Sequence, residues 1–258
     1  IQTLNFGCAG YGTDQAYLRY LIQGRQFHPD IVVYVCTMEN DAFDVSSKLN
    51  GAMLGFKPFF DITRDTWMPF EKISRIEGDP GSHVWYRQSH VYTMKRIGMI
   101  RFRNWWRQTF GKIKKSPLPL HWTTFYVPMN DEWKQAWETL NILTKNFKSV
   151  VESDGATFIL VLVPNRFQIH PEYWEEIARK HQFDKEVDLF YPDRTMLDIS
   201  KRIGATTLNL YPSMKAAASE RRRLYFSHDG HFTLKGNEAV GDALAEFISP
   251  YISARPES

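Results

Sequence analysis

The chain has 258 residues, a formal net charge of +3 and 24% charged residues. This length suffices for one large α/β domain with a substantial core, and the composition excludes disordered and fibrous classes. The slight net charge argues against nucleic acid as a partner. The two cysteines, Cys8 and Cys36, form neither a zinc-binding spacing nor a disulfide framework.

No targeting segment is visible in the sequence. No apolar run approaches the length of a membrane span, and the first residues, IQTLNFG, lack the basic start and apolar stretch of a signal peptide. Either the protein is cytoplasmic or a targeting segment lies upstream of Ile1. The absence of an initiating methionine favours a processed or trimmed chain, and the compartment stays open.

The chain begins with a pattern typical of a strand, a turn and a helix. Residues Gln2–Phe6 predict a short strand, and the glycine-rich turn Gly7–Gly12 follows it. Thr13 or Asp14 then caps a helix that is expected to run to about Gln26.

A second strand is predicted at Ile31–Cys36. This run is continuous, apolar and rich in β-branched residues, as in a strand buried on both faces of a parallel sheet. The polar cluster Thr37–Asp41 follows it directly. Because ligands bind at the carboxyl ends of strands in open parallel sheets, these polar residues are candidates for a site.

Residues 43–130 have an irregular pattern and are interpreted as an insertion. Within it, residues 90–115 combine many basic side chains with Trp105, Trp106 and Phe110. The favoured interpretation is a solvated basic helix whose aromatic side chains pack on the core. The alternative is contact with a membrane surface or an anionic polymer.

Helical spacing returns at Asp131 and continues to the stop signal at Asp154-Gly155, with Trp133 and Trp137 on the apolar face. The tryptophans are therefore predicted to belong to the core rather than to a sugar-binding platform. A second buried strand follows at Thr157–Val163.

The loop after that strand carries Asn165, Arg166 and Gln168, which are expected to face the same sheet edge as Asn40. Further elements are predicted in the order helix, helix, strand, short helix and helix, at His170–Lys180, Asp188–Ile203, Thr206–Leu210, Tyr211–Arg223 and Leu234–Ile248. Strands that alternate with helices predict a doubly wound parallel sheet, here in a single domain spanning residues 1–258.

Asp229 and His231 are separated by one glycine and lie just before the last predicted helix. In a hydrolytic triad a carboxylate fixes the tautomer of an imidazole, and the imidazole moves the proton. Taken alone, an Asp-Gly-His run is more often a solvated turn with a helix cap. His228 is a competing imidazole.

Three separated stretches, in this order, resemble sequence blocks of the SGNH (GDSL-type) hydrolases. Leu4–Gln15 is similar to their second block, Pro29–Asp41 to the third, and Asp229–Gly236 to the last. The resemblance implies a three-layer, flavodoxin-like α/β fold. The run Lys57–Phe60 also looks like a subgroup with a long insertion after the third block.

The resemblance further implies a role for each matching residue. The backbone N–H of Gly10 and the side-chain amide of Asn40 would form an oxyanion hole, His231 would be the general base, and Asp229 would hold its ring. Without the resemblance, Gly10 is equally a plain turn glycine and Asn40 a helix cap. The implied substrate is an acyl ester of a small molecule, saccharide or lipid, and neither a metal nor a cofactor is implied.

The sequence departs from the family pattern in two places. A single residue separates the acid from the histidine, as in the alginate O-acetyltransferase relatives, so hydrolysis and acyl transfer both remain open. The first block, a central strand that ends in Gly-Asp-Ser and carries the nucleophile, is absent. None of the candidate serines lies in the turn from a strand to a helix that this nucleophile requires; the serines considered are Ser46, Ser47, Ser82 and Ser227. We therefore infer that residues upstream of Ile1 supply both the strand and the serine, and that the 258-residue chain alone folds poorly and lacks esterase activity.

The sequence thus predicts a serine esterase of the SGNH type. One alternative is an O-acyltransferase acting on a polysaccharide, and another is a non-catalytic module that binds an acylated glycan and lacks the nucleophile. A third alternative uses Cys8 as the nucleophile, because a thiolate is stabilised near a helix start. The role of a small buried hydrophobe is favoured for both cysteines.

Overall fold

Three parallel strands form the centre of the fold. The structure is a computed structural model, and it describes residues 2–53, 57–68, 98–99, 116–219, 223–227 and 230–253. The strands are β1 (Ile31–Thr37), β6 (Thr157–Val163) and β9 (Thr206–Asn209), in the order β1-β6-β9. All pairs are parallel, with Ile31 opposite Thr157 and Ile159 opposite Thr206. The predicted α/β class with a parallel sheet is confirmed.

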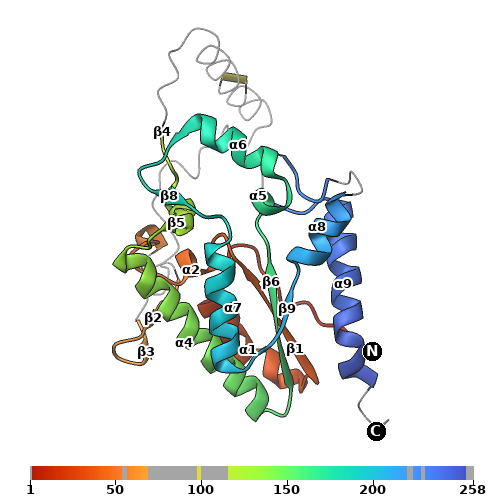
Figure 1. The fold of residues 1–258 in the computed structure, drawn as a ribbon. Coiled ribbons are helices and arrows are strands. Elements are labelled where there is room, and N and C mark those ends of the chain that lie inside the picture. Colours follow the sequence, from red (N-terminus) through yellow and green to blue (C-terminus); the bar gives the residue numbers. More distant parts are fainter. Residues whose placement is uncertain are drawn as a thin grey trace.

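Helices cover both faces of this sheet (Figure 1). One face carries α1 (Thr13–Ile22), α4 (Asp131–Ser153) and α7 (Tyr191–Ile203), and the other carries α8 (Tyr211–Ser219) and α9 (Leu234–Ser253). Two further helices, α5 (Arg166–Ile169) and α6 (Pro171–Lys180), follow the carboxyl end of β6. The arrangement has the three layers expected of a flavodoxin-like fold.

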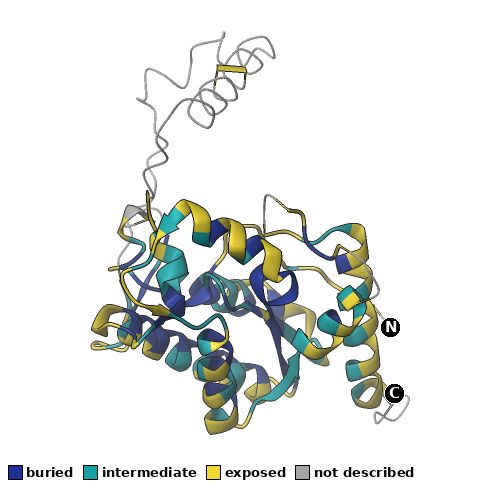
Figure 2. Ribbon diagram, turned by 45° about the horizontal axis from the view of Figure 1, so that its top comes forward, coloured by how far each residue is buried: buried dark blue, intermediate teal, exposed yellow. Residues whose placement is uncertain are grey.

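Alternate side chains of β6 enter the two cores. Phe158, Leu160 and Leu162 join the cluster under α1, α4 and α7, whereas Ile159 and Val161 join the cluster under α8 and α9. Side chains of successive strand residues point to opposite faces, so a strand covered on both sides must be apolar throughout. Figure 2 shows the sheet in the interior and the exposed residues on the outer sides of the helices.

Helix α4 begins where the sequence places its capping residue. The side chain of Asn130 accepts a hydrogen bond from the backbone N–H of Trp133 at 2.9 Å, which satisfies one of the free amides of the first turn. Trp133 and Trp137 are both buried. The prediction that these tryptophans belong to the core is confirmed.

The predicted strand at Gln2–Phe6 is not formed. Within the described part of the chain, β1 is an edge strand, and residues 2–6 do not pair with its free edge. The prediction that the second strand is buried on both faces is wrong at Val35, whose side chain is 51% exposed. A strand is covered on both faces only where neighbouring elements reach it.

The polar segment after β6 is a helical turn rather than a loop. Asn165 caps α5, accepting hydrogen bonds from the backbone N–H groups of Phe167 and Gln168. Asn-x-x-Gln is a capping-box spacing, which explains why these polar residues form a helix start.

The remaining described elements are short. They are η1 (Gly24–Phe27), α2 (Asp41–Asp44), η2 (Gly51–Met53), β2 (Phe60–Asp61), β3 (Thr66–Trp67), β4 (Ser116–Pro117), η4 (Leu120–Phe125), β5 (Tyr126–Val127), β7 (His181–Gln182) and β8 (Glu186–Val187). Apart from residues 98 and 99, the basic aromatic stretch at 90–115 lies outside the described residues. Among the helices described here, none has the length and apolar character needed to cross a bilayer.

Candidate functional site

The end of β1 and the segment before α9 meet in space. A Cβ placed on Gly230 would lie 3.9 Å from Oε2 of Glu39, the residue that precedes Asn40. Residues 225–226 pair with residues 231–232: Tyr225 forms an antiparallel bridge with Phe232, and the N–H of Phe226 donates to the carbonyl of His231 at 3.1 Å. The structure therefore brings the third and last sequence blocks to one rim.

Asn40 lies at the start of α2 with its amide directed at a carboxylate. Its Nδ2 donates to Oδ2 of Asp44 at 2.8 Å, and its side chain makes no capping bond to the helix backbone. An amide nitrogen carries two hydrogens, so the bond to Asp44 fixes the direction of the group and leaves the second hydrogen for another acceptor.

Gly10 lies in an exposed turn with a positive φ of 77°. The turn is closed by the N–H of Tyr11, which donates to the carbonyl of Cys8 at 3.2 Å. This conformation favours glycine, and an added Cβ would meet no atom within 4 Å. The turn is thus open at the position where a side chain would project from residue 10.

The end of this turn packs against the partner of Asn40. A Cβ on Gly12 would lie 3.0 Å from Cβ of Asp44 and 3.2 Å from Nζ of Lys57. Asp44 therefore contacts both predicted oxyanion segments, the turn and the amide.

A buried ion pair underlies these segments. Nζ of Lys57 lies 2.8 Å from Oδ1 of Asp14, with side-chain exposures of 3% and 0%, and it also donates to the carbonyl of Asp44 at 2.7 Å. Burial raises the pKa of Asp14 more than the ammonium of Lys57 lowers it. Sequence reasoning missed this pair, although a lysine beside the apolar run Pro58–Phe60 was a usable signal.

Two further carboxyl groups beside Asn40 hold protons unusually tightly. Burial raises the pKa of Asp41 to about 7, even though its carboxylate accepts the backbone N–H of Thr37. Burial also raises the pKa of Asp44 to about 6, against the opposing effects of Lys57 and Asn40. A low-dielectric surrounding disfavours the ionised form of each.

These shifts predict that the contribution of the two carboxyl groups to stability falls as the pH rises from about 4 towards 7. Folded Asp41 keeps its proton up to a pH of about 7, whereas the unfolded residue ionises near its ordinary value of 3.8. The contribution of Asp41 to the free energy of unfolding is complete below pH 3.8 and is lost as the pH rises towards 7. We expect Asp41→Asn to flatten the decline between pH 5 and 7 by about 1 kcal/mol per pH unit, measured by urea unfolding. Asp131→Asn, at an exposed position, should leave the slope unchanged, and an equally steep slope in Asp41→Asn would contradict the prediction.

Aromatic residues of the insertion lie beside Glu39 at the carboxyl end of β1. Nε1 of Trp122 donates to Oε1 of Glu39 at 2.6 Å, and its ring packs edge-on against Phe167 at 5.3 Å. His121 packs edge-on against Phe43. Burial lowers the pKa of His121, and the charge of Glu39 opposes that effect. Sequence reasoning missed His121 and Trp122, because nothing local marks an insertion residue as part of the rim.

Arg166 contacts the segment that precedes the last block. It is buried, and its Nη1 donates to the carbonyl of Ser227 at 3.4 Å. Gln168 instead points into the interior, where its amide donates to Asp193 at 2.6 Å. Of the two, only Arg166 contacts the segment that carries His231.

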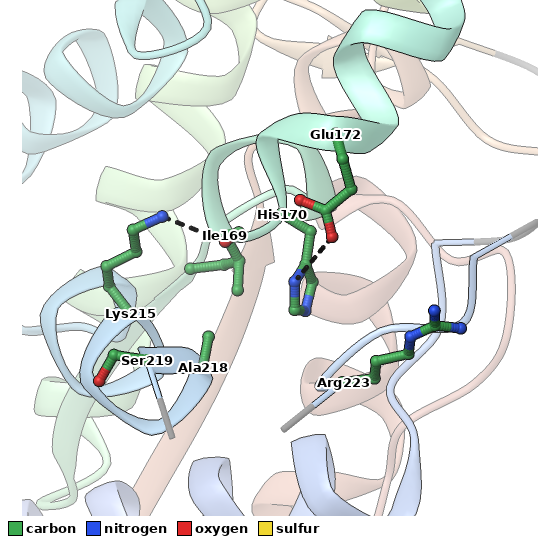
Figure 3. A pocket seen from close by; sticks show the side chains of 7 residues that line it. All are labelled: Ile169, His170, Glu172, Lys215, Ala218, Ser219 and Arg223. Atoms are coloured by element: carbon green, nitrogen blue, oxygen red, sulfur yellow. Dashed lines mark hydrogen bonds and ion pairs between the residues drawn. The ribbon is translucent and has the colours of Figure 1, made fainter. Parts of the chain in front are cut away.

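A separate cavity of about 520 Å³ is lined by residues of α5, α6 and α8 and by Arg223 (Figure 3). Nε2 of His170 accepts the backbone N–H of Leu224 at 3.2 Å, and Nδ1 lies 3.6 Å from Glu172. Burial lowers the pKa of His170, as do Lys215 and Arg223, while Glu172 opposes them. A neutral imidazole retains an unprotonated nitrogen, which can accept the backbone N–H of Leu224. Gly10, Asn40 and His231 do not line this cavity.

Asp229 and the competing His228 lie outside the described residues, and His231 is exposed. The roles of Gly10, Asn40, Asp229 and His231 therefore stay predictions. Cys36 is fully buried, as expected, but Cys8 is exposed, so its interpretation as a buried hydrophobe is wrong. Cys8 lies in the turn itself, which has no core to bury it.

Comparison with known proteins gives one match. Residues 123–258 match the family model described as the SGNH hydrolase-like domain of the acetyltransferase AlgX. The matched segment begins in η4 and includes β6, α9 and the Asp-Gly-His run. No curated protein and no solved structure matched the chain.

Proposed function

The chain belongs to the family of AlgX-type SGNH hydrolase-like domains, and on this basis we propose that it transfers an acyl group from an ester to a saccharide hydroxyl through a serine acyl-enzyme. Membership in the family supports an activity of the esterase or acyltransferase type. Transfer is proposed over hydrolysis because the family model is that of an acetyltransferase.

In the proposed mechanism His231 takes the proton from a serine hydroxyl as its oxygen attacks the carbonyl carbon of the donor ester. Gly10 and Asn40 stabilise the resulting oxyanion, and His231 returns the proton to the departing alcohol. The acceptor hydroxyl then gives its proton to His231 and attacks the acyl-enzyme. The new ester leaves and the serine regains its proton, so the chain ends the cycle unchanged.

The observation that carries this proposal is the proximity of Gly230 to Glu39 at the carboxyl end of β1, where a Cβ placed on Gly230 would lie 3.9 Å from Oε2 of Glu39. These two residues immediately precede Asn40 and His231. An oxyanion donor and a general base must both come within reach of one reacting ester, and this proximity supports such an arrangement.

The proposed serine comes from a segment upstream of Ile1. The free edge of β1 within the described chain and the 51% exposure of Val35 support a further parallel strand beside it. Such a strand would end at the same rim as β1, because parallel strands share their carboxyl edge. It would also give residues 2–6 a neighbour with which to pair.

The proposal is tested by labelling the full-length protein with a fluorophosphonate and mapping the modified peptide by mass spectrometry. We expect one labelled serine, N-terminal to Ile1. The 258-residue chain alone should take up no label. Absence of labelling in the full-length protein would instead favour a non-catalytic binding module.

Transfer and hydrolysis are separated by supplying an acetyl ester donor with and without a saccharide acceptor. Under the proposal, acetylated saccharide appears in mass spectra and its formation exceeds the release of free acetate. Release of acetate alone, at a rate unaffected by acceptors of differing charge and length, would assign the protein as an esterase.

A further inference from the structure

Asp44 forms a hydrogen bond at each of its polar atoms. Its backbone N–H donates to the carbonyl of Asn40 at 2.8 Å, and its own carbonyl accepts Nζ of Lys57 at 2.7 Å. In the side chain, Oδ2 accepts Nδ2 of Asn40 at 2.8 Å, and Oδ1 accepts Nδ2 of Asn50 at 3.2 Å. Asp44 is therefore joined to Asn40 through both its backbone and its side chain.

The residue that holds the other carboxylate oxygen is itself fixed. The backbone N–H of Asn50 donates to the carbonyl of Ser46 at 2.9 Å, and the carbonyl of Asn50 accepts the N–H of Met53 at 2.9 Å. The amide of Asn50 thus binds Oδ1 of Asp44 from an ordered turn. This leaves Oδ2 for the amide of Asn40.

Asn40 precedes α2, but its side chain does not cap that helix. An asparagine at this position usually accepts a backbone N–H of the first turn through its side-chain oxygen. Here the side-chain nitrogen donates to the carboxylate of Asp44 instead. Helix capping therefore does not account for the orientation of the amide, and the contact with Asp44 does.

The two ends of an amide group have opposite hydrogen-bonding character, since the nitrogen donates and the oxygen accepts. A rotation of the group by half a turn would exchange the two. An ionised carboxylate only accepts hydrogen bonds, so Asp44 selects the orientation in which the nitrogen of Asn40 faces it. The second hydrogen of that nitrogen is then available to an oxyanion, which an amide oxygen would repel.

The geometry points to Asp44 as a positioning residue that, in its ionised form, holds the amide of Asn40 in the orientation that binds the oxyanion. This inference rests on the proposed function. A hydrogen bond to an ionised acceptor is about twice as strong as one between neutral groups. Protonated Asp44 carries a hydroxyl that can donate to the amide oxygen, so the reversed orientation of Asn40 becomes available.

The groups around Asp44 set the pH range in which the amide is held. Burial raises the pKa of Asp44 to about 6, the charge of Lys57 and the hydrogen bond from Asn40 oppose this rise, and the charge of Asp14 adds to it. The charge of Asp44 contributes in turn to the raised pKa of Asp41. Folded Asp44 is ionised above a pH of about 6 and takes up a proton below it.

Nuclear magnetic resonance of the side-chain amide of Asn40 tests the contact without any need for activity. The full-length protein is labelled with ¹⁵N and titrated from about pH 7.5 to about pH 5, and the Asn40 signals are assigned by their loss in Asn40→Ala. We expect both amide hydrogens to shift with a common midpoint at a pH of about 6. In Asp44→Asn, whose side chain does not ionise, this step should disappear.

Two results of the titration would overturn the inference. The first is a wild-type amide that does not respond over this pH range. The second is a step that persists unchanged in Asp44→Asn, which would assign it to another carboxyl group such as that of Asp41.

Turnover of an acyl ester tests the positioning role. Near pH 7.5 we expect Asp44→Ala to lower kcat by about ten- to a hundredfold with little change in KM. Asp44→Asn, which keeps the shape and one acceptor oxygen, should lower kcat less and provides the test if Asp44→Ala does not fold. The double variant Asn40→Ala/Asp44→Ala should be no slower than Asn40→Ala alone, because Asp44 acts through the amide. A purely structural Asp44 would instead add its own loss.

Asp154→Asn is the matched control. Asp154 also accepts two side-chain hydrogen bonds, from Tyr20 at 2.9 Å and from Arg25 at 2.5 Å, but it lies just before β6, at the amino ends of the strands. This variant should keep the wild-type kcat and amide titration. An unchanged kcat in both Asp44 variants would refute the positioning role. If the wild-type protein turns over no acyl ester, the proposed function fails, and the amide titration still decides whether Asp44 holds Asn40.

Discussion

Replacement of His231 by alanine in the full-length protein should lower turnover of an acyl ester by at least about a thousandfold. Without the imidazole, the serine proton has no acceptor in the attack and the leaving alcohol has no donor. Both steps lose general acid–base catalysis, so kcat falls much more than KM rises. Steady-state kinetics with a chromogenic acetyl ester measure the loss of turnover. The rate of fluorophosphonate labelling measures the loss of serine activation.

His28 provides the control for this variant. It is an exposed histidine in a left-handed conformation with φ of 46°, so His28→Asn changes an imidazole at a position where asparagine is tolerated. Its kinetics should match the wild type. Labelling at the wild-type rate in His231→Ala would remove His231 from the mechanism and direct attention to His228.

The largest effect on stability is expected from Lys57→Met. This change leaves the carboxylate of Asp14 buried at 0% exposure without its cation and removes a donor from the carbonyl of Asp44. Breaking a buried pair by removing one partner costs about 3–5 kcal/mol, because the remaining charge is uncompensated. Urea unfolding monitored by circular dichroism measures the loss.

The double variant Lys57→Met/Asp14→Asn should recover much of that loss, since it leaves no buried charge. Lys148→Met is the matched control: it breaks a partly exposed pair with Glu152 and should cost less than about 1 kcal/mol. Equal losses in the Lys57 and Lys148 variants would show that the buried pair has no special role.

The elements most accurately predicted from the sequence are those with long, regular patterns. Helix α4 was predicted from Asp131 to the stop at Asp154, and the structure ends it at Ser153. Strand β6 was predicted at exactly its observed residues, Thr157–Val163. In both elements the spacing of apolar residues in the sequence agrees with the burial in the structure. An amphipathic helix and a strand buried on both faces have distinct patterns of apolar residues.

The predictions failed where structure depends on distant partners. Residues 2–6 have a strand-like sequence but no neighbouring strand in the described chain, and the polar turn at Asn165 forms a helix because its own side chain caps it. Trp122 belongs to the rim only because Glu39 accepts its indole N–H. No local pattern encodes such a contact across 83 positions.

The sequence alone determined the family, the α/β class and the short set of residues with suitable chemistry, because these depend on residue type, order and periodicity. Only the tertiary structure decided that Asp14 and Lys57 form a buried pair, that Asp44 accepts a hydrogen bond from the amide of Asn40, and that Gly230 lies near Glu39. Hydrogen bonds and ion pairs form over about 3 Å, whereas the sequence records only the order of residues along the chain.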